Sequence, residues 1–209
     1  MTIRLGDEAP DFTADTTDGQ IHFHDWKSGS WAILFSHPAD FTPVCTTELG
    51  RTAALKEAFA ERNTKAIAIS VDPIEDHLRW APHIGEVGGT ELNFPIIADP
   101  DRVVAEQYDM IHPAAGDAST VRSVFVIDPS NIVRLTLTYP KSVGRNFDEL
   151  VRVIDALQAT DAAPIATPAD WRPGDRVIVS PALSTEDARE RLTNVTEIKP
   201  YLRYADQPS

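Results

Sequence analysis

The stretch of the chain from Trp31 to Gly50, WAILFSHPADFTPVCTTELG, constrains the fold more than any other. Its first five residues form an apolar run of strand length, far shorter than the ~20 residues of a membrane-spanning helix. After a short loop, Thr42 and Pro43 mark a helix start, because threonine is a good N-cap and proline fits the first helical position. We therefore expect a buried strand that leads through a loop into a helix.

Cys45 is the only cysteine among the 209 residues, and it falls in the first turn of this predicted helix. A lone cysteine usually serves as a small apolar residue in a protein core. Here its neighbours Thr42, Thr46, Thr47 and Glu48 offer hydrogen-bond donors and acceptors instead of an apolar stripe. Unpaired backbone N–H groups and the helix dipole at a helix start also stabilise an anion. We therefore interpret Cys45 as a reactive thiol that is readily ionised.

The composition narrows the range of partners and compartments. The net charge is 19 − 32 = −13, so the surface repels nucleic-acid phosphates and anionic lipids. The first residues, MTIRLGDEAPDF, lack the apolar core of a secretory signal, and no run is long enough to cross a membrane. A single cysteine cannot form an internal disulfide. We expect a cytoplasmic protein with no nucleic-acid and no membrane partner.

Alternating strand and helix patterns predict an α/β fold with a mixed central sheet. An N-terminal hairpin is expected at 11–23 around the turn Asp18-Gly19. Further strands are expected at 31–35, 66–71, 94–98, 121–127 and 132–138, and helices at 43–61, 74–84, 102–108 and 147–158.

The composition changes near Thr160, where a proline-bearing linker begins. The last fifty residues contain one strand pattern at 176–179 and one helix pattern at 185–192. A segment of this size rarely buries enough surface to fold alone. We therefore predict a main domain at 1–160 and a small C-terminal α+β extension at 161–209 that packs on a neighbour.

The spacing Pro38-x-x-x-Thr42-x-x-Cys45 resembles the active-site motif of the peroxiredoxins, which are thiol peroxidases with a thioredoxin-like fold. The longer run SHPADFTPVCTTELG is similar to the one-cysteine, peroxiredoxin-6-like subfamily, in which a histidine occupies the place of His37. Further blocks in the same order are VRSVFVIDP at 121–129, YP at 139–140 with GRNFDE at 144–149, ATPADW at 166–171 and KPYLRY at 199–204. The resemblance therefore extends over nearly the whole chain.

This resemblance implies that the Cys45 thiolate attacks hydrogen peroxide or an alkyl hydroperoxide and becomes a sulfenic acid. Greater ionisation of a thiol gives only about a few-fold gain, because a less basic thiolate is a weaker nucleophile. The larger effect must come from holding the peroxide in line and stabilising the departing oxygen. Thr42, the backbone N–H of Cys45 and Arg122 are the expected donors. Its position at the start of an apolar strand would otherwise make Arg122 an outward surface charge. The resemblance implies instead that Arg122 contacts the thiolate and the peroxide.

Four further residues are expected at the substrate site. Pro38 shields the thiolate and shapes the loop, and His37 hydrogen-bonds the site or has a structural role. Glu48 and Arg145 form a charged pair that orients Arg122. The other five histidines show no convincing metal-ligand spacing, with His22-x-His24 a weak pattern, so we expect neither a metal nor a cofactor.

The reductant must come from outside the chain, because Glu48 occupies the last position of a would-be Cys-x-x-Cys motif. Glutathione, thioredoxin or another small thiol would reduce the sulfenic acid before further oxidation makes it irreversible. The resemblance also implies a homodimer or a ring of dimers.

Two other functions compete with the peroxidase interpretation. Some animal relatives are credited with a phospholipase site, and His24 and Ser30 match two of its three positions, with Ser130 at the third. The sequence around Ser30 lacks the glycines of a Gly-x-Ser-x-Gly elbow, which disfavours this hydrolase. A chaperone-like assembly without catalysis is the second alternative, which the sequence does not test.

Overall fold

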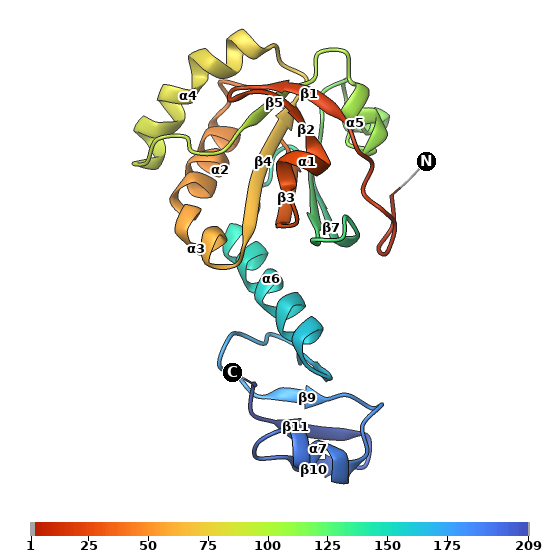
Figure 1. The fold of residues 1–209 in the computed structure, drawn as a ribbon. Coiled ribbons are helices and arrows are strands. Elements are labelled where there is room, and N and C mark those ends of the chain that lie inside the picture. The colour runs from red at the N-terminus through yellow and green to blue at the C-terminus, as the bar shows by residue number, and fades with distance from the viewer. Residues whose placement is uncertain (1–2, 209) are drawn as a thin grey trace. The chain divides into compact units, whose positions relative to one another are not determined.

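The computed structural model describes residues 3–208 and divides the chain into two compact units, 1–147 and 148–209. Helix α6 (Phe147–Ala162) begins at this division (Figure 1). The boundary at 160/161 lies near the end of the same helix and stays a prediction.

The first unit is built on a seven-stranded mixed sheet of order β2-β1-β5-β4-β3-β6-β7. Its central strands β3 (Trp31–Ser36), β4 (Thr64–Ser70) and β5 (Ile96–Ala98) run parallel, whereas β6 (Arg122–Ile127) and β7 (Val133–Tyr139) add an antiparallel hairpin beside β3. The hairpin of β1 (Thr13–Thr16) and β2 (Gly19–His22) joins the other edge through β5. This arrangement confirms the expected mixed α/β sheet.

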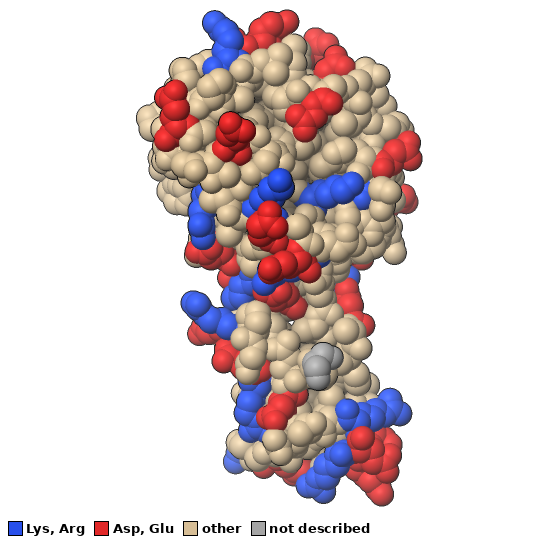
Figure 2. Space-filling view, turned by 60° about the vertical axis from the view of Figure 1, so that its left-hand side comes forward, with Lys and Arg blue, Asp and Glu red and all other residues tan. Residues whose placement is uncertain are grey.

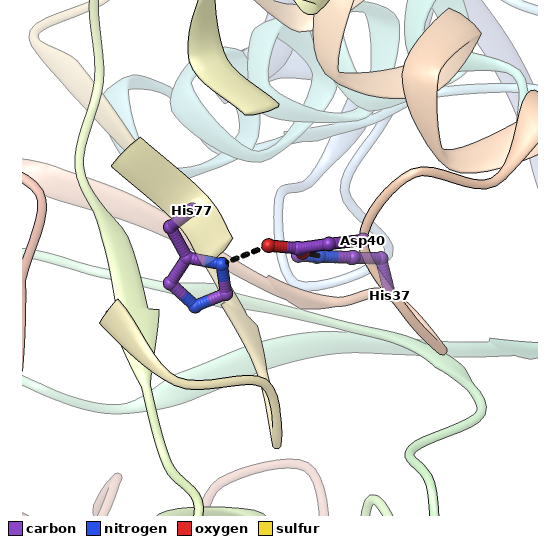
Figure 3. A group of neighbouring side chains, drawn as sticks. All are labelled: His37, Asp40 and His77. Atoms are coloured by element: carbon purple, nitrogen blue, oxygen red, sulfur yellow. Dashed lines mark hydrogen bonds and ion pairs between the residues drawn. The ribbon is translucent and has the colours of Figure 1, made fainter. Parts of the chain in front are cut away.

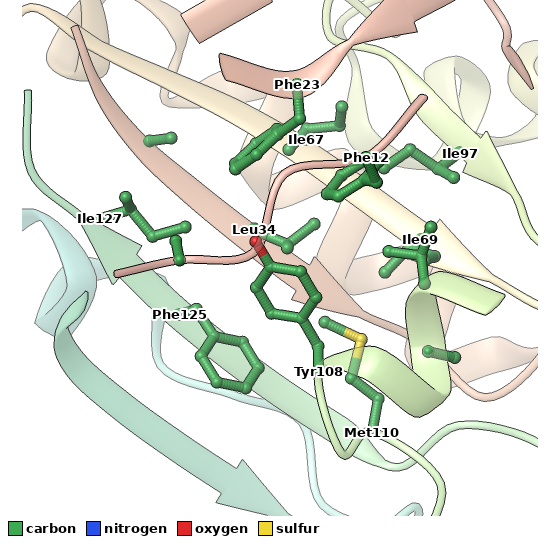
Figure 4. Close-up of a cluster of buried hydrophobic side chains, with 14 of the residues drawn as sticks. Phe12, Phe23, Leu34, Ile67, Ile69, Ile97, Tyr108, Met110, Phe125 and Ile127 are labelled. Atoms are coloured by element: carbon green, nitrogen blue, oxygen red, sulfur yellow. The ribbon is translucent and has the colours of Figure 1, made fainter. Parts of the chain in front are cut away.

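Alternate residues of the central strands bury one face of this sheet in an apolar cluster (Figure 4). Leu34, Ile67 and Phe125 come from three neighbouring strands, and each is at most 6% exposed. The cluster is covered by helix α1 (Phe23–Lys27), helix α5 (Val103–Gln107) and the N-terminal segment that carries Phe12, whose ring stacks on Phe23 at 4.7 Å. Strand β3 is apolar at five consecutive positions, so apolar side chains point to both faces of the sheet and the strand is buried along its whole length.

On the opposite face of the sheet, the ring of Phe35 contacts the rings of Phe94 and Phe147. Helix α2 (Pro43–Ala54), which follows β3, packs against α4 (Ile74–Gly88). Gly50 and Gly88 let the two helix backbones meet, because a Cβ atom at Gly50 would lie 2.9 Å from the Gly88 Cα. This close approach fixes how the Cys45 helix sits beside α4.

The predicted single helix 43–61 is wrong at one point. The helix stops at Ala54, and α3 (Lys56–Glu61) begins after Leu55, whose φ of −92° and ψ of 9° are not helical. The other first-unit elements agree with the prediction within a few residues. The N-terminal turn lies at 17–18, because Thr16 pairs directly with Gly19. Helix α1 and the short 3₁₀ helix η1 (Pro113–Ala115) were not predicted.

The second unit holds a four-stranded antiparallel sheet of order β10-β11-β9-β8. Its strands are β8 (Ile165–Ala166), β9 (Val177–Val179), β10 (Thr196–Lys199) and β11 (Leu202–Ala205), and helix α7 is Thr185–Arg191. A separate apolar cluster around the buried Trp171 forms its core. The sequence predicted β9 and α7 but missed the other three strands, which are two to four residues long.

Charged side chains of both signs are interspersed over the face in Figure 2, without a large basic patch on that face. None of the helices in residues 3–208 is long and apolar enough to cross a membrane.

Candidate active site

Cys45 lies in the first turn of α2, as predicted, and is fully buried. Thr42 is the N-cap residue with an extended backbone, and Pro43 is the first helical residue. The Thr42 side chain accepts no capping bond from the helix backbone, and its hydroxyl donates to the carbonyl oxygen of Ala39 at 2.8 Å. Its oxygen lone pairs remain available to accept a hydrogen bond beside the thiol.

Arg122 is the group in contact with the sulfur. Its Nη1 lies 3.4 Å from the Cys45 Sγ, although the two residues are 77 positions apart in the chain. Strand β6 pairs with β3, which leads directly into the Cys45 loop, so the sheet brings the start of β6 beside the thiol. Arg122 is only 2% exposed, and its Nε donates to the carbonyl oxygen of Lys141 at 2.8 Å.

Glu48 connects the two arginines of the site. Its Oε2 accepts hydrogen bonds from Arg122 Nη1 and Arg145 Nη2, both at 2.7 Å. Its Oε1 accepts from the Nε and the backbone N–H of Arg145 at 2.9 and 2.8 Å. Arg145 Nη1 donates to the carbonyl oxygen of Ser123, and its guanidinium lies over the ring of Phe35. The carboxylate is therefore surrounded by donors that fix both guanidinium groups.

The charges of this buried cluster favour an anion at the sulfur. Two guanidinium groups and one carboxylate give +2 − 1 = +1, and a Cys45 thiolate neutralises the remainder. Burial alone would raise the pKa of Glu48, but hydrogen bonds and the charge from Arg145, together with the charge of Arg122, outweigh it and hold the pKa below its ordinary value. Glu48 thus stays ionised.

The site offers a bound peroxide both hydrogen-bond donors and a hydrogen-bond acceptor. Arg122 Nη2 has no hydrogen-bond partner within residues 3–208, so its two N–H groups can donate to a peroxide oxygen. Thr42 Oγ1 can accept the hydrogen of a hydroperoxide because its own hydrogen is bound to Ala39. The arrangement can bind an –O–O–H group beside Cys45.

His37 and Pro38 lie in the loop between β3 and α2, and both are buried. Figure 3 shows that His37 belongs to a buried group with Asp40 and His77. The sequence did not single out Asp40, and it placed His77 among the histidines without metal-ligand spacing. His77 stands on α4, 37 positions from Asp40, and no local pattern links the two residues. The shielding role of Pro38 stays a prediction.

The residues of the alternative hydrolase site are not joined into a catalytic group. Ser30 Oγ donates to the carbonyl oxygen of Lys27 at 2.6 Å, and His24 Nε2 lies 2.9 Å from the carbonyl oxygen of Ala9. The other ring nitrogen of His24 faces the amide of Asn131 at 3.3 Å. No hydrogen bond joins Ser30 to His24 within the described chain, so the geometry does not support a serine nucleophile.

Comparison with known proteins gives matches over both units. Residues 5–136 match the family model of the AhpC/TSA family, and residues 156–194 match that of the C-terminal domain of one-cysteine peroxiredoxins. The chain is 49% identical to the one-cysteine peroxiredoxin of Dictyostelium discoideum, over 99% of this chain and 86% of that protein.

Two solved structures are similar along the whole chain. A cysteine-to-serine mutant of peroxiredoxin 6 from Arenicola marina has a TM-score of 0.94 and 44% identity, and the match covers 99% of each chain. The yeast mitochondrial one-cysteine peroxiredoxin, studied for thiol resolution through the glutathione and thioredoxin systems, has a TM-score of 0.93 and 48% identity, over 98% of this chain and 100% of that one.

Proposed function

Because the chain belongs to the one-cysteine peroxiredoxins, a family of thiol peroxidases with a thioredoxin-like fold, we propose that Cys45 attacks peroxides with the help of Arg122 and Thr42. The observation that carries this proposal is the 3.4 Å contact between Arg122 Nη1 and the Cys45 sulfur, with the same nitrogen bonded to Glu48. A guanidinium stays charged and presents several donors in a fixed plane, which suits a thiolate and a peroxide at once.

The reaction begins with attack of the Cys45 thiolate on the nearer oxygen of a hydroperoxide. The S–O bond forms as the O–O bond breaks, which gives Cys45 sulfenic acid and an alkoxide or hydroxide ion that takes up a proton. Negative charge moves from the sulfur to the departing oxygen. Arg122 contacts the sulfur through Nη1 and has Nη2 unpaired within the described residues, so one guanidinium can follow this shift of charge.

Glu48 and Arg145 act through Arg122. Glu48 accepts one hydrogen bond from Arg122 and three from Arg145, and Arg122 Nε donates to Lys141. These bonds hold the plane of the Arg122 guanidinium, so it does not need to reorganise when charge develops. Thr42 orients the peroxide by accepting its hydrogen, and Pro38 keeps water from the thiolate.

An external thiol then regenerates the enzyme. The first thiol condenses with the sulfenic acid to release water and form a mixed disulfide, and a second thiol releases Cys45 and leaves as a disulfide. The similar yeast mitochondrial protein is resolved through the glutathione and thioredoxin systems, so these are the reductants we propose first. A reducing compartment such as the cytoplasm would supply them.

Mass spectrometry after one equivalent of peroxide tests the nucleophile and the reductant together. We expect one added oxygen on Cys45, which dimedone traps, and its removal by glutathione or reduced thioredoxin. Cys45→Ser should abolish peroxide consumption. An untouched Cys45, or a Cys45→Ser protein that consumes peroxide normally, would reject the proposal.

We also propose that the protein forms a homodimer or a ring of dimers. Strand β7 lies at one edge of the main sheet, and among residues 3–208 the N-terminal segment pairs only with the beginning of β7, through Gly6, Asp7 and Val133. The rest of this edge can pair with a second copy. Sedimentation should give at least a dimer, and the double substitution T136E and T138E, which puts like charges along the edge, should give a monomer. A monomeric unmodified protein would contradict this proposal.

A further inference from the structure

The buried group of His37, Asp40 and His77 has no part in the reaction as described so far. Both oxygens of the Asp40 carboxylate are used: Oδ1 lies 2.9 Å from His37 Nε2, and Oδ2 lies 2.5 Å from His77 Nδ1. The side chains of both histidines are 0% exposed and that of Asp40 is 2% exposed. Ionisable side chains are rarely buried so completely, so this group of one carboxylate and two imidazoles needs an explanation.

The partners of His77 determine where its hydrogens lie. Its Nδ1 faces the Asp40 carboxylate, and its Nε2 lies 3.1 Å from the carbonyl oxygen of Ile97. Carboxylate and carbonyl oxygens only accept hydrogen bonds, so both ring nitrogens of His77 must donate. His77 is therefore an imidazolium, and it forms a buried ion pair with Asp40.

The same reasoning applies to His37. The Asp40 carboxylate can only accept, so His37 Nε2 must carry a hydrogen. Burial lowers the pKa of His37 more than Asp40 raises it, which keeps the ring neutral and leaves Nδ1 without a hydrogen. Among the described residues, His37 Nδ1 is the only buried side-chain nitrogen or oxygen without a hydrogen-bond partner. An orphaned buried acceptor is costly and points to a donor that arrives from outside the chain.

The position of His37 connects this acceptor to the site. His37 directly follows β3 in the loop that ends at Thr42, and its carbonyl oxygen accepts from Thr120 Oγ1 at 2.7 Å. Thr120 stands two residues before Arg122. Asp40 anchors the same loop a second time, because its backbone N–H donates to Asp72 at 3.0 Å.

We propose that Asp40 and His77 are positioning residues of the peroxidase site, which hold His37 in the neutral form with its hydrogen on Nε2 and a bare acceptor at Nδ1. In that form His37 accepts the second O–H hydrogen of bound hydrogen peroxide, while Thr42 accepts the first. This inference rests on the proposed function, but the state of the three rings can be measured without any turnover.

A bound metal ion is the competing explanation, since two histidines and an aspartate are a common ligand set. The spacing argues against it. A tetrahedral Zn²⁺ ion with bonds of about 2.0 Å separates its ligand atoms by roughly 3.3 Å. The observed 2.5 and 2.9 Å are hydrogen-bond distances, which a shared hydrogen fills and an ion does not.

Nitrogen-15 NMR of the histidine rings tests the proposal directly in the full-length protein. We expect His37 to show a protonated Nε2 and an unprotonated Nδ1, and His77 to be protonated on both nitrogens at neutral pH. A His37 ring with its hydrogen on Nδ1 would overturn the proposal. So would stoichiometric binding of added zinc that the substitution Asp40→Asn abolishes.

Two substitutions of His77 separate positioning from simple packing. An asparagine side chain places an N–H where Nδ1 was, so His77→Asn should keep the His37 signal and the rate constant for Cys45 oxidation within about threefold. His77→Leu leaves Asp40 without that donor, and we expect the single His37 form to disappear and the rate constant to fall about tenfold or more. Equal rate losses in both variants with an unchanged His37 signal would refute the proposal.

Substitutions of His37 itself identify the nitrogen that matters. His37→Asn keeps an acceptor near the Nδ1 position, whereas His37→Gln keeps a donor near Nε2. We expect the asparagine variant to react faster with peroxide, and the reverse order would contradict the proposed acceptor. Asp25→Asn, at a side chain that is 86% exposed, is the matched control and should change nothing. If Cys45→Ser retains turnover, the proposed function fails while the ring measurements stand.

Discussion

Replacement of Glu48 by glutamine removes the negative charge from the centre of the active site with little change of shape. Glu48 is 3% exposed and accepts four hydrogen bonds from Arg122 and Arg145. A glutamine amide keeps one acceptor oxygen but turns an N–H₂ group toward guanidinium donors. Two buried guanidinium groups then have only the Cys45 thiolate as a counter-charge in this cluster.

The expected cost follows from the burial of the pair. Removal of one partner from a buried ion pair destabilises a protein by about 3–5 kcal/mol, because the remaining charge is left uncompensated. For a chain of this size, about 2–4 °C of melting temperature is lost per kcal/mol, so we expect a fall of roughly 6–20 °C. The rate constant for Cys45 oxidation should fall by about 10²–10³, the loss typical of one displaced donor at a developing anion.

Thermal unfolding by circular dichroism and stopped-flow oxidation of Cys45 at 25 °C measure the two effects separately. Glu48→Asp keeps the charge but shortens the reach of the carboxylate, so it shows how much depends on geometry. Glu61→Gln is the matched control, since that side chain is 76% exposed and lies 3.6 Å from Arg62; it should leave the melting temperature within about 1 °C. A Glu48→Gln protein that melts within 2 °C of the unmodified one and reacts within threefold of its rate would refute the reasoning.

Three further outcomes follow from the structure. Arg122→Ala should slow Cys45 oxidation by several powers of ten while the circular dichroism spectrum at 25 °C stays native, and a rate within tenfold of the unmodified one would remove Arg122 from the mechanism. The folded-state pKa of Glu48 lies below its ordinary 4.5, so the stabilisation that Glu48 provides is complete above pH 4.5 and is lost as the pH falls through the lower folded-state pKa. The free energy of unfolding, measured at decreasing pH, should show this loss, and the loss should be smaller in Glu48→Gln. Gly50→Ala places a Cβ 2.9 Å from the Gly88 Cα and should cost about 1–3 kcal/mol in urea unfolding. Gly85→Ala, whose Cβ would meet its nearest neighbour at an ordinary 3.5 Å, should cost nothing; equal costs would show that the helix contact is not tight.

The sequence by itself determined the local frame of the site. An apolar strand, a short loop, a threonine N-cap and a proline at the first helical position place Cys45 in the first turn of α2, because these signals act between residues only a few positions apart. The absence of a second cysteine likewise requires an outside reductant whatever the fold. The resemblance of the motifs to a known family supplied Arg122, which local reasoning would have left on the surface, and Glu48 and Arg145 were then predicted as the pair that orients it.

Only the tertiary structure decided which side chains meet. Arg122 reaches Cys45 across 77 residues because β6 pairs with β3, and Arg145 reaches Glu48 across 97 residues. The contact between Asp40 and His77 joins a loop to a helix that lies beyond the next strand, and no periodicity in the chain encodes it. Propensities and caps act over one or two helical turns, whereas strand order and helix packing depend on burial of the whole core. A buried charge finds its partner only when that core has formed.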